Sequence, residues 1–349
     1  MRWPWQRAAS GDQLVLSWSG QALAYVRAKA LRDGGFEVLQ LGVEHQGSDS
    51  MNDFVERLEA LQLKGCATAV MLRPEQYSLL QIPAPVVPPE ELKSAARYQI
   101  REMVDLHIDD LTMDVLHVGD GQQKNNPQLF VVAAANAKVR DVMDLARAME
   151  WPVNVIDIQE TCQRNLQAAL AQRAGAGDRA DACLVVSDDH QALITISAKG
   201  ELYYTRRLEL PEGFLALAWS QGSEAIVEAP DGYTPVTEYV PDYAGAGLAF
   251  GSPAQQTEAD RAQRFVVELQ RSLDLWDRTW SNLPLVGVRV YAGERSAEMA
   301  TWLSRETGAA VSAMELEPLF PGLQATPELE RAICLPLLGL LLRSESRVP

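Results

Sequence analysis

The sequence contains an internal repeat, and this repeat constrains the fold more than any other feature. Residues 14–29 read LVLSWSGQALAYVRAK and residues 184–199 read LVVSDDHQALITISAK, so half of the positions coincide at an offset of 170 (184 − 14). Each window opens a pattern typical of three antiparallel strands followed by helix and strand. A period this long is not that of a solenoid. The repeat therefore predicts two similar α/β lobes.

The rest of the pattern supplies the other elements of each lobe. Alternating and 3.6-residue hydrophobic periods predict strands and helices, while Gly and Pro clusters predict turns and linkers. In the first half we expect strands at 14–18, 21–29, 36–43, 67–72, 111–118, 129–135 and 153–158, helices at 53–63, 90–106, 138–150 and 160–173, and a proline-rich linker at 83–89. In the second half we expect strands at 183–187, 192–198, 201–208, 286–291 and 310–316, helices at 258–280, 297–306 and 328–342, and an irregular stretch at 230–253.

These elements predict a division into three parts. Residues 1–158 form a first lobe with an inserted subdomain, residues 159–327 form a second lobe, and residues 328–349 contain a helix that returns to the first lobe. Two such lobes with a cleft between them describe the actin-like (ribonuclease H-like) ATPase fold, which actin, Hsp70 and sugar kinases share.

Composition excludes several classes of function. The 349 residues carry 47 Asp and Glu against 31 Lys and Arg, a net charge of −16, which disfavours nucleic-acid binding. The longest apolar stretch, 334–342, is about half of the ~20 residues that a membrane-spanning helix needs. No C-x-x-C or zinc spacing occurs, so buried free thiols in a reducing cytoplasm are expected. The cysteines are Cys66, Cys162, Cys183 and Cys334.

A series of segments in order along nearly the whole chain carries a resemblance to a known family. They are 89–100 (PEELKSAARYQI), the acidic stretch 105–110 leading to 113–115 (MDV), 131–135 (VVAAA), 155–158 (VIDI), 204–206 (YTR), 269–274 (LQRSLD) and 336–340 (PLLGL). The chain resembles the PilM/MshI family of actin-like proteins of type IV pilus assembly, and most closely its MshI branch, which is associated with MSHA-type pili. The cytoplasmic part of type II secretion GspL proteins has a related pattern.

The resemblance also indicates where a nucleotide would bind. In nucleotide-binding relatives the first strand of each lobe ends in Asp and runs into a Gly/Ser-rich turn, and a third element carries paired glycines. Here Ser17 stands in place of the first Asp, Asp188 and Asp189 lie in the second turn where they would repel phosphate, and Gly293 is followed by Glu294. We expect no ordinary Mg-ATP hydrolysis and no cofactor or metal. The candidate residues of this degenerate nucleotide cleft are Ser17, Ser19, Gly20, Ser187, Asp188 and Gly293.

Three functions remain to be compared. The resemblance implies a non-enzymatic scaffold at the cytoplasmic face of the inner membrane, held there by the short cytoplasmic tail of a PilN-like membrane protein and by other pilus assembly proteins. The alternatives are an actin-like nucleotide-binding ATPase of the pilus or GspL-like machinery, and a small-molecule kinase, which the missing Asp disfavours. No phosphate loop of the G-x-x-x-x-G-K-[ST] kind occurs. Trp3 and Trp5 lie in a basic arm that either docks on the protein or touches a membrane or partner.

Overall fold

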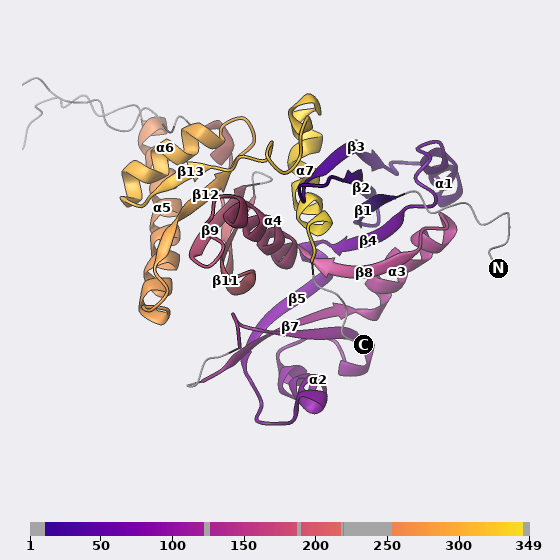
Figure 1. The fold of residues 1–349 in the computed structure, drawn as a ribbon, viewed down its shortest axis with the longest axis horizontal. Coiled ribbons are helices and arrows are strands. Elements are labelled where there is room, and N and C mark those ends of the chain that lie inside the picture. Colours follow the sequence, from indigo (N-terminus) through magenta and orange to yellow (C-terminus); the bar gives the residue numbers. More distant parts are fainter. Residues whose placement is uncertain (1–10, 122–125, 187–189, 218, 220–252, 345–349) are drawn as a thin grey trace, which may run out of the picture.

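Two lobes and a smaller attached sheet make up the fold (Figure 1). The computed structural model describes residues 11–121, 126–186, 190–217, 219 and 253–344. The Trp3–Trp5 arm, the site candidates Ser187 and Asp188, and nearly all of the irregular stretch 230–253 lie outside these residues.

The first lobe is a five-stranded sheet with the strand order β3-β2-β1-β4-β8. Its apolar residues alternate along β1, so that Leu14, Leu16 and Trp18 face one side and Val15 the other. The first side is covered by α1 and α3; Ser50 caps α1 by accepting a hydrogen bond from the Asp53 backbone N–H. The elements are β1 (Asp12–Trp18), β2 (Ala22–Ala30), β3 (Phe36–His45), α1 (Met51–Glu59), β4 (Ala67–Leu72), α3 (Asn136–Ala148) and β8 (Val153–Ile158).

The second lobe repeats this topology, with the strand order β11-β10-β9-β12-β13. In both lobes the first strand pairs antiparallel with the second and parallel with the fourth, which confirms the duplicated architecture. The elements are β9 (Ala180–Val186), β10 (Gln191–Ala198), β11 (Glu201–Glu209), α5 (Pro253–Thr279), β12 (Leu285–Tyr291), α6 (Ser296–Thr307) and β13 (Val311–Ala313). Trp276 of α5 is buried in this lobe's core.

The constant offset of 170 does not extend across both strands of the hairpin. Leu14 lies opposite Arg27, whereas Leu184 lies opposite Ile194 and not opposite Ser197. The second hairpin is therefore paired three residues out of step with the offset (197 − 194). A repeat in sequence thus marks a repeat in topology here, while the pairing of strands depends on the length of each turn.

A third sheet, with the order β5-β7-β6, forms the smaller unit inserted in the first half. The sequence pattern predicts no strand before the proline-rich linker at 83–89, and this prediction is wrong. A strand runs up to the first of these prolines and ends at Pro83. Proline is tolerated there since β5 is an edge strand that pairs only with β7 among the described strands. The helix expected to reach residue 106 ends at Gln99 and continues as a short 3₁₀ turn. The elements are β5 (Tyr77–Pro83), α2 (Pro89–Gln99), β6 (Leu111–His117) and β7 (Gln128–Ala135).

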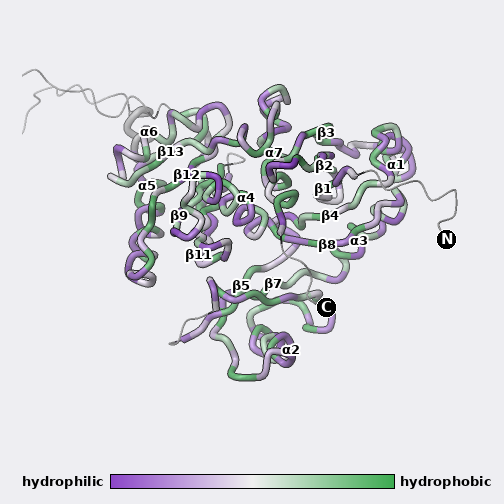
Figure 2. The backbone as a smooth tube through the Cα atoms, viewed as in Figure 1, coloured by the Kyte–Doolittle hydropathy of each residue, from purple (hydrophilic) through white to green (hydrophobic). Residues whose placement is uncertain are grey.

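Two helices, α4 (Gln159–Arg173) and α7 (Glu328–Leu341), lie between the sheets of the lobes (Figure 1). They pack on each other, α7 also contacts β1, β2 and β3, and α4 also contacts β9, β10 and β11. Much of the second half of α7 is hydrophobic (Figure 2) and is buried in a core shared by both lobes. At the crossing, a Cβ on Gly339 would overlap the carbonyl oxygen of Cys162, so only glycine fits. The division at residues 158 and 327 stays a prediction.

Three smaller features complete the fold. The strand expected over 310–316 is shortened to Val311–Ala313, because the chain turns away after three paired residues. All four cysteines are buried free thiols. Within the described ranges, no helix has the length and apolar character that crossing a bilayer requires.

Candidate functional site

The first candidate element is the end of β1. Ser17 is 2% exposed and lies on the same side of the sheet as Val15, toward the core between the lobes. Its hydroxyl oxygen has no hydrogen-bond partner among the described residues. The position is therefore polar and inward-facing, but it offers a neutral hydroxyl where a metal-positioning carboxylate would be needed.

The turn between β1 and β2 is closed on itself. The Ser19 hydroxyl accepts hydrogen bonds from the backbone N–H groups of Gln21 at 3.2 Å and Ala22 at 2.9 Å, and the Ser19 N–H donates to the Ala22 carbonyl at 3.0 Å. Gly20 adopts φ +92°, which the tight turn requires. A phosphate cradle needs backbone N–H groups that are free to bind an anion. In this turn the backbone N–H groups of Ser19, Gln21 and Ala22 already have acceptors within the turn.

The third candidate element, around Gly293, binds one of the chain's own carboxylates. Gly293 has φ +59°, and the next backbone N–H, that of Glu294, donates to Glu328 Oε1 at 2.7 Å. A Cβ at Gly293 would overlap this oxygen. Beside it lies a pocket of about 490 Å³ lined by Gly293, three glutamates (Glu294, Glu315 and Glu317) and one cation, Arg331. This lining would repel a phosphate group.

The contacts of these elements do not converge on one ligand site. Gly293 faces the start of α7, and the pocket beside it is not lined by Ser17, Ser19 or Gly20. The turn that holds Ser187 and Asp188 lies outside the described residues, so the repulsion expected from Asp188 stays a prediction. In the described part of the chain, no group of His, Cys, Asp and Glu is arranged to hold a metal ion.

An ion pair that the sequence pattern did not reveal joins α4 to β11 and, through Tyr77, to the smaller sheet. The Glu160 side chain, 3% exposed at the start of α4, accepts a hydrogen bond from Arg207 of β11 at 2.6 Å and another from the Tyr77 hydroxyl of β5. Arg207 also donates to Tyr77 at 2.9 Å and to Gln159 at 2.9 Å. Burial and the neighbouring Glu160 carboxylate raise the pKa of Tyr77 well above its ordinary value. Tyr77 therefore stays a neutral donor, and the network fixes the smaller sheet, α4 and β11 together.

The smaller unit exposes several large apolar side chains in and beside α2. Its core is formed where α2 packs on the three strands through Ala96 and Ile100, and Arg97 donates to the carbonyls of Ile108 at 2.6 Å and Leu111 at 3.2 Å. Four of the nine large apolar side chains that the described residues expose lie within 86–106. Exposed apolar side chains that form a contiguous patch are typical of protein contact sites. The four are Val86, Tyr98, Met103 and Leu106, which we call the α2 surface.

Comparison with known proteins assigns the fold. No protein-family model matches the sequence, and no curated protein matches it either. Among solved structures, the chain is similar to one titled as the PilM–PilN type IV pilus biogenesis complex, with a TM-score of 0.62, 15% identity, and coverage of 96% of this chain and 100% of that chain. The chain therefore has the two-lobed actin-like ATPase fold.

Two further solved structures are more distant. The cytoplasmic domain of EpsL, from the type II secretion system of Vibrio cholerae, has a TM-score of 0.40 and 14% identity, and covers 72% of this chain and 95% of that one. A Bacteroides thetaiotaomicron protein described as having an actin-like ATPase fold and unknown function has a TM-score of 0.47 and 10% identity, with coverage of 96% and 97%.

Proposed function

We propose that this protein is a PilM-like, non-catalytic scaffold of type IV pilus assembly, of the MshI branch that serves MSHA-type pili. It works at the cytoplasmic face of the inner membrane and is held there by the cytoplasmic tail of a PilN-like membrane protein. The observation that carries the proposal is the similarity in fold to the PilM–PilN complex along essentially the whole of both chains.

The geometry of the cleft supports a scaffold over an enzyme. Ser17 supplies no carboxylate, Ser19 occupies the N–H groups of its turn, and Glu328 occupies the N–H group beside Gly293. Each feature removes a group that Mg-ATP binding needs. Restoring the carboxylate alone, in Ser17→Asp, therefore creates no activity in this proposal. Phosphate release from Mg-ATP above a no-protein control, in a preparation free of contaminating ATPases, would contradict the proposal.

The alternative function is an actin-like ATPase of a pilus or secretion machine. The buried Ser17 hydroxyl without a described partner is the observation that favours it, because such a group is available to a ligand. Titration of a fluorescent ATP analogue with Mg²⁺ separates the two functions. Saturable binding that Ser17→Ala weakens would support the alternative.

We assign the partner tail to the first lobe, with the α2 surface as part of its contact. A short extended tail that buries apolar side chains on Tyr98 and Met103 gives binding in the micromolar range, roughly −8 kcal/mol. Such affinity is sufficient where an array presents many tails. Both side chains are exposed, 70% and 51%, so polar substitution there leaves the core intact.

The test is fluorescence anisotropy of a labelled peptide with the cytoplasmic tail sequence of the PilN-like protein from the same cells. Tyr98→Asp with Met103→Asp should weaken binding by roughly tenfold or more. Leu275→Asp is the matched control, because Leu275 is 50% exposed but lies on α5 in the other lobe. Equal binding by all three proteins would overturn the assignment of the surface, and no binding by the wild type would overturn the partner.

A further inference from the structure

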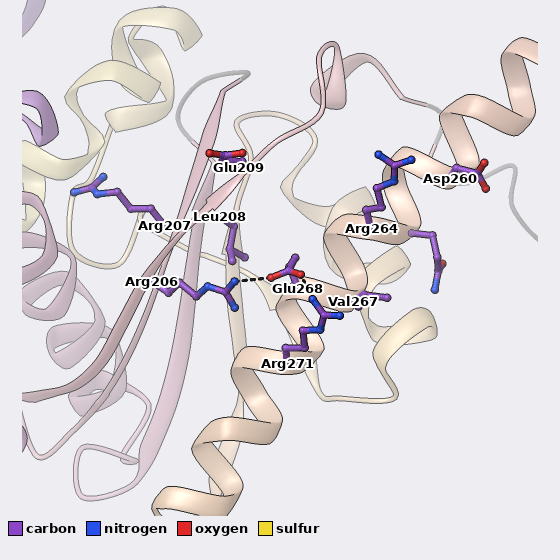
Figure 3. Close-up of a pocket in the computed structure, with 10 residues that line it drawn as sticks. Arg206, Arg207, Leu208, Glu209, Asp260, Arg264, Val267, Glu268 and Arg271 are labelled. Carbon is purple, nitrogen blue, oxygen red and sulfur yellow. Dashed lines mark hydrogen bonds and ion pairs between the residues drawn. The ribbon is translucent and has the colours of Figure 1, made fainter. Parts of the chain in front are cut away.

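A groove in the second lobe runs between the edge of β11 and one face of α5. It has a volume of about 730 Å³, which lies within the usual range of ligand sites of roughly 300–1,000 Å³. It lies away from the α2 surface and from the Gly293 pocket, and shares no lining residue with either. Figure 3 shows its lining, which comprises Arg206, Arg207, Leu208, Glu209, Asp260, Gln263, Arg264, Val267, Glu268 and Arg271.

The groove follows the backbone edge of β11. Four consecutive residues, 206–209, line it, although successive side chains of a strand point to opposite faces. The side-chain contacts show this alternation. Leu208 is buried in the core with α5, while Arg207 reaches Glu160 on the other face of the sheet. Neighbours on opposite faces can line one groove only where it passes along the strand's edge.

Within the described residues, no strand pairs with this edge over its second half. Among the described strands β11 pairs with β10 alone, at the end of its sheet. Near its start the carbonyl of Leu202 is already used, since it accepts a hydrogen bond from the Gly119 N–H at 2.7 Å. From Arg206 to Glu209 the groove takes the place of such a neighbour. An unpaired edge offers backbone N–H and C=O groups to an added strand.

The opposite wall is a single stripe of α5. The lining positions 260, 263, 264, 267, 268 and 271 recur at intervals of three and four, the spacing of one helix face. A strand edge on one side and a helix face on the other is the arrangement in which domains bind a peptide by adding it to a sheet. At about 3.3 Å per residue, the part of β11 that lines the groove accommodates an added strand of roughly four residues.

Charge decides which peptide fits. Arg206 and Arg271 share one carboxylate, that of Glu268, at 2.5 Å from Arg206 (Figure 3). Arg264 has no hydrogen bond or ion pair within the described part of the chain, and it projects from the same stripe. Each guanidinium has five N–H donors, so one shared carboxylate leaves most of them available. The lining holds four arginines against three carboxylates, those of Glu209, Asp260 and Glu268, so its net charge is slightly positive in a chain of net charge −16. Arg264, with no described partner, is the group that favours an incoming carboxylate.

An alternative role for the charged side chains of β11 is to prevent this edge from pairing with other chains, as charged residues on edge strands often do. Two contacts weigh against it. Arg206 is held toward α5 by Glu268, and Arg207 is held toward Glu160 behind the sheet. Neither side chain is therefore placed across the backbone edge that it would have to guard.

We propose that the β11–α5 groove is a second docking site, in which an extended acidic peptide of a partner protein adds as a strand to β11 and places a carboxylate against Arg264 and Arg271. The site is independent of the tail contact on the first lobe. A protein with both sites joins two partners, one on each lobe.

The test selects ten-residue peptides from a phage-displayed library on the full chain and measures the enriched peptides by fluorescence anisotropy. We expect acidic residues at alternating positions, and a loss of affinity of roughly tenfold or more in Arg264→Glu with Arg271→Glu. Arg140→Glu, an exposed arginine on α3, is the matched control and should bind as the wild type does. Absence of any enriched peptide, or enrichment without acidic bias, would overturn the proposal.

Backbone pairing has its own test. An added strand uses the N–H groups of every second residue toward β11. Two versions of one peptide are compared: the first is N-methylated at its odd-numbered residues and the second at its even-numbered residues. One of them should lose binding by roughly tenfold or more, and the other should retain it. Equal behaviour of the two methylated peptides would show that the peptide does not add to the edge.

Discussion

Glu328, the first residue of α7, accepts a hydrogen bond at 2.7 Å from the backbone N–H of Glu294. The carboxylate oxygen thereby lies close to the position that a Cβ at Gly293 would take. One contact joins the turn after β12 of the second lobe to α7, which contacts the sheet of the first lobe. It fills a position where an anionic ligand would otherwise find a donor.

Gly293→Ala should destabilise the protein by about 1–3 kcal/mol, because alanine is strained at φ +59° and its Cβ would overlap Glu328. Urea unfolding measures the change. In the double variant with Glu328→Ala the overlap is gone and only the strain remains, so the two costs should be less than additive. Strict additivity would mean that the Glu328 side chain rotates away and relieves the overlap at little cost.

Arg207→Leu should destabilise by about 3–5 kcal/mol, since it leaves the Glu160 carboxylate buried without its cation. Glu160→Gln should cost less, because an amide oxygen still accepts hydrogen bonds from Tyr77 and Arg207. The exposed pair Arg147–Asp144 is the control, and Arg147→Leu should change stability by less than about 1 kcal/mol. Similar losses for Arg147→Leu and Arg207→Leu would show that the buried network is not specially stabilising.

Gly339→Ala should be among the most destabilising single methyl additions, at about 3 kcal/mol or more. The added Cβ meets the backbone carbonyl of Cys162, which cannot rotate away as a side chain could. Thermal unfolding followed by circular dichroism measures the effect. Ala332→Gly, on the partly buried part of the same helix, is the comparison and should cost only about 0.5–1 kcal/mol.

Stability should fall as the pH rises above about 9. Burial raises the pKa of the Cys334 thiol to about 12 from an unfolded value of 9.0. The unfolded chain releases this proton first, so the stabilising contribution is complete below pH 9.0 and is lost as the pH rises toward 12. Urea midpoints between pH 8 and pH 11 give the slope, which Cys334→Ala should reduce. An unchanged slope would assign the alkaline loss to other groups, such as Tyr77.

Sequence periodicity predicted most of the helices and strands because each has one clear apolar face. β5 was missed for the opposite reason: Tyr77–Pro83 has only Ile82 deeply buried and runs into prolines, so neither alternation nor composition marks it. The repeat predicted the topology of both lobes, but the pairing of Leu184 with Ile194 depends on a turn length that a residue match does not encode.

The site was less accessible than the fold. Ser17 and Gly293 could be found because a position in a strand or turn can be compared with a motif. Glu160 and Arg207 are 47 residues apart and belong to no motif, and a polar helix such as α4 ordinarily indicates an exposed surface. Only the packing of α4 between two sheets shows that its charges are buried and paired.

The smaller sheet is attached to the second lobe as well as to the first. Gly119 donates to Leu202, Val118 and Phe130 pack against the same residue, and Tyr77 joins Arg207 through Glu160. Together with the packing of α4 on α7, these contacts connect the two lobes at two separate places. If the lobes opened about a hinge at one of these two sets of contacts, the other set would have to break. A pulling force on the smaller sheet would therefore be transmitted to both lobes at once.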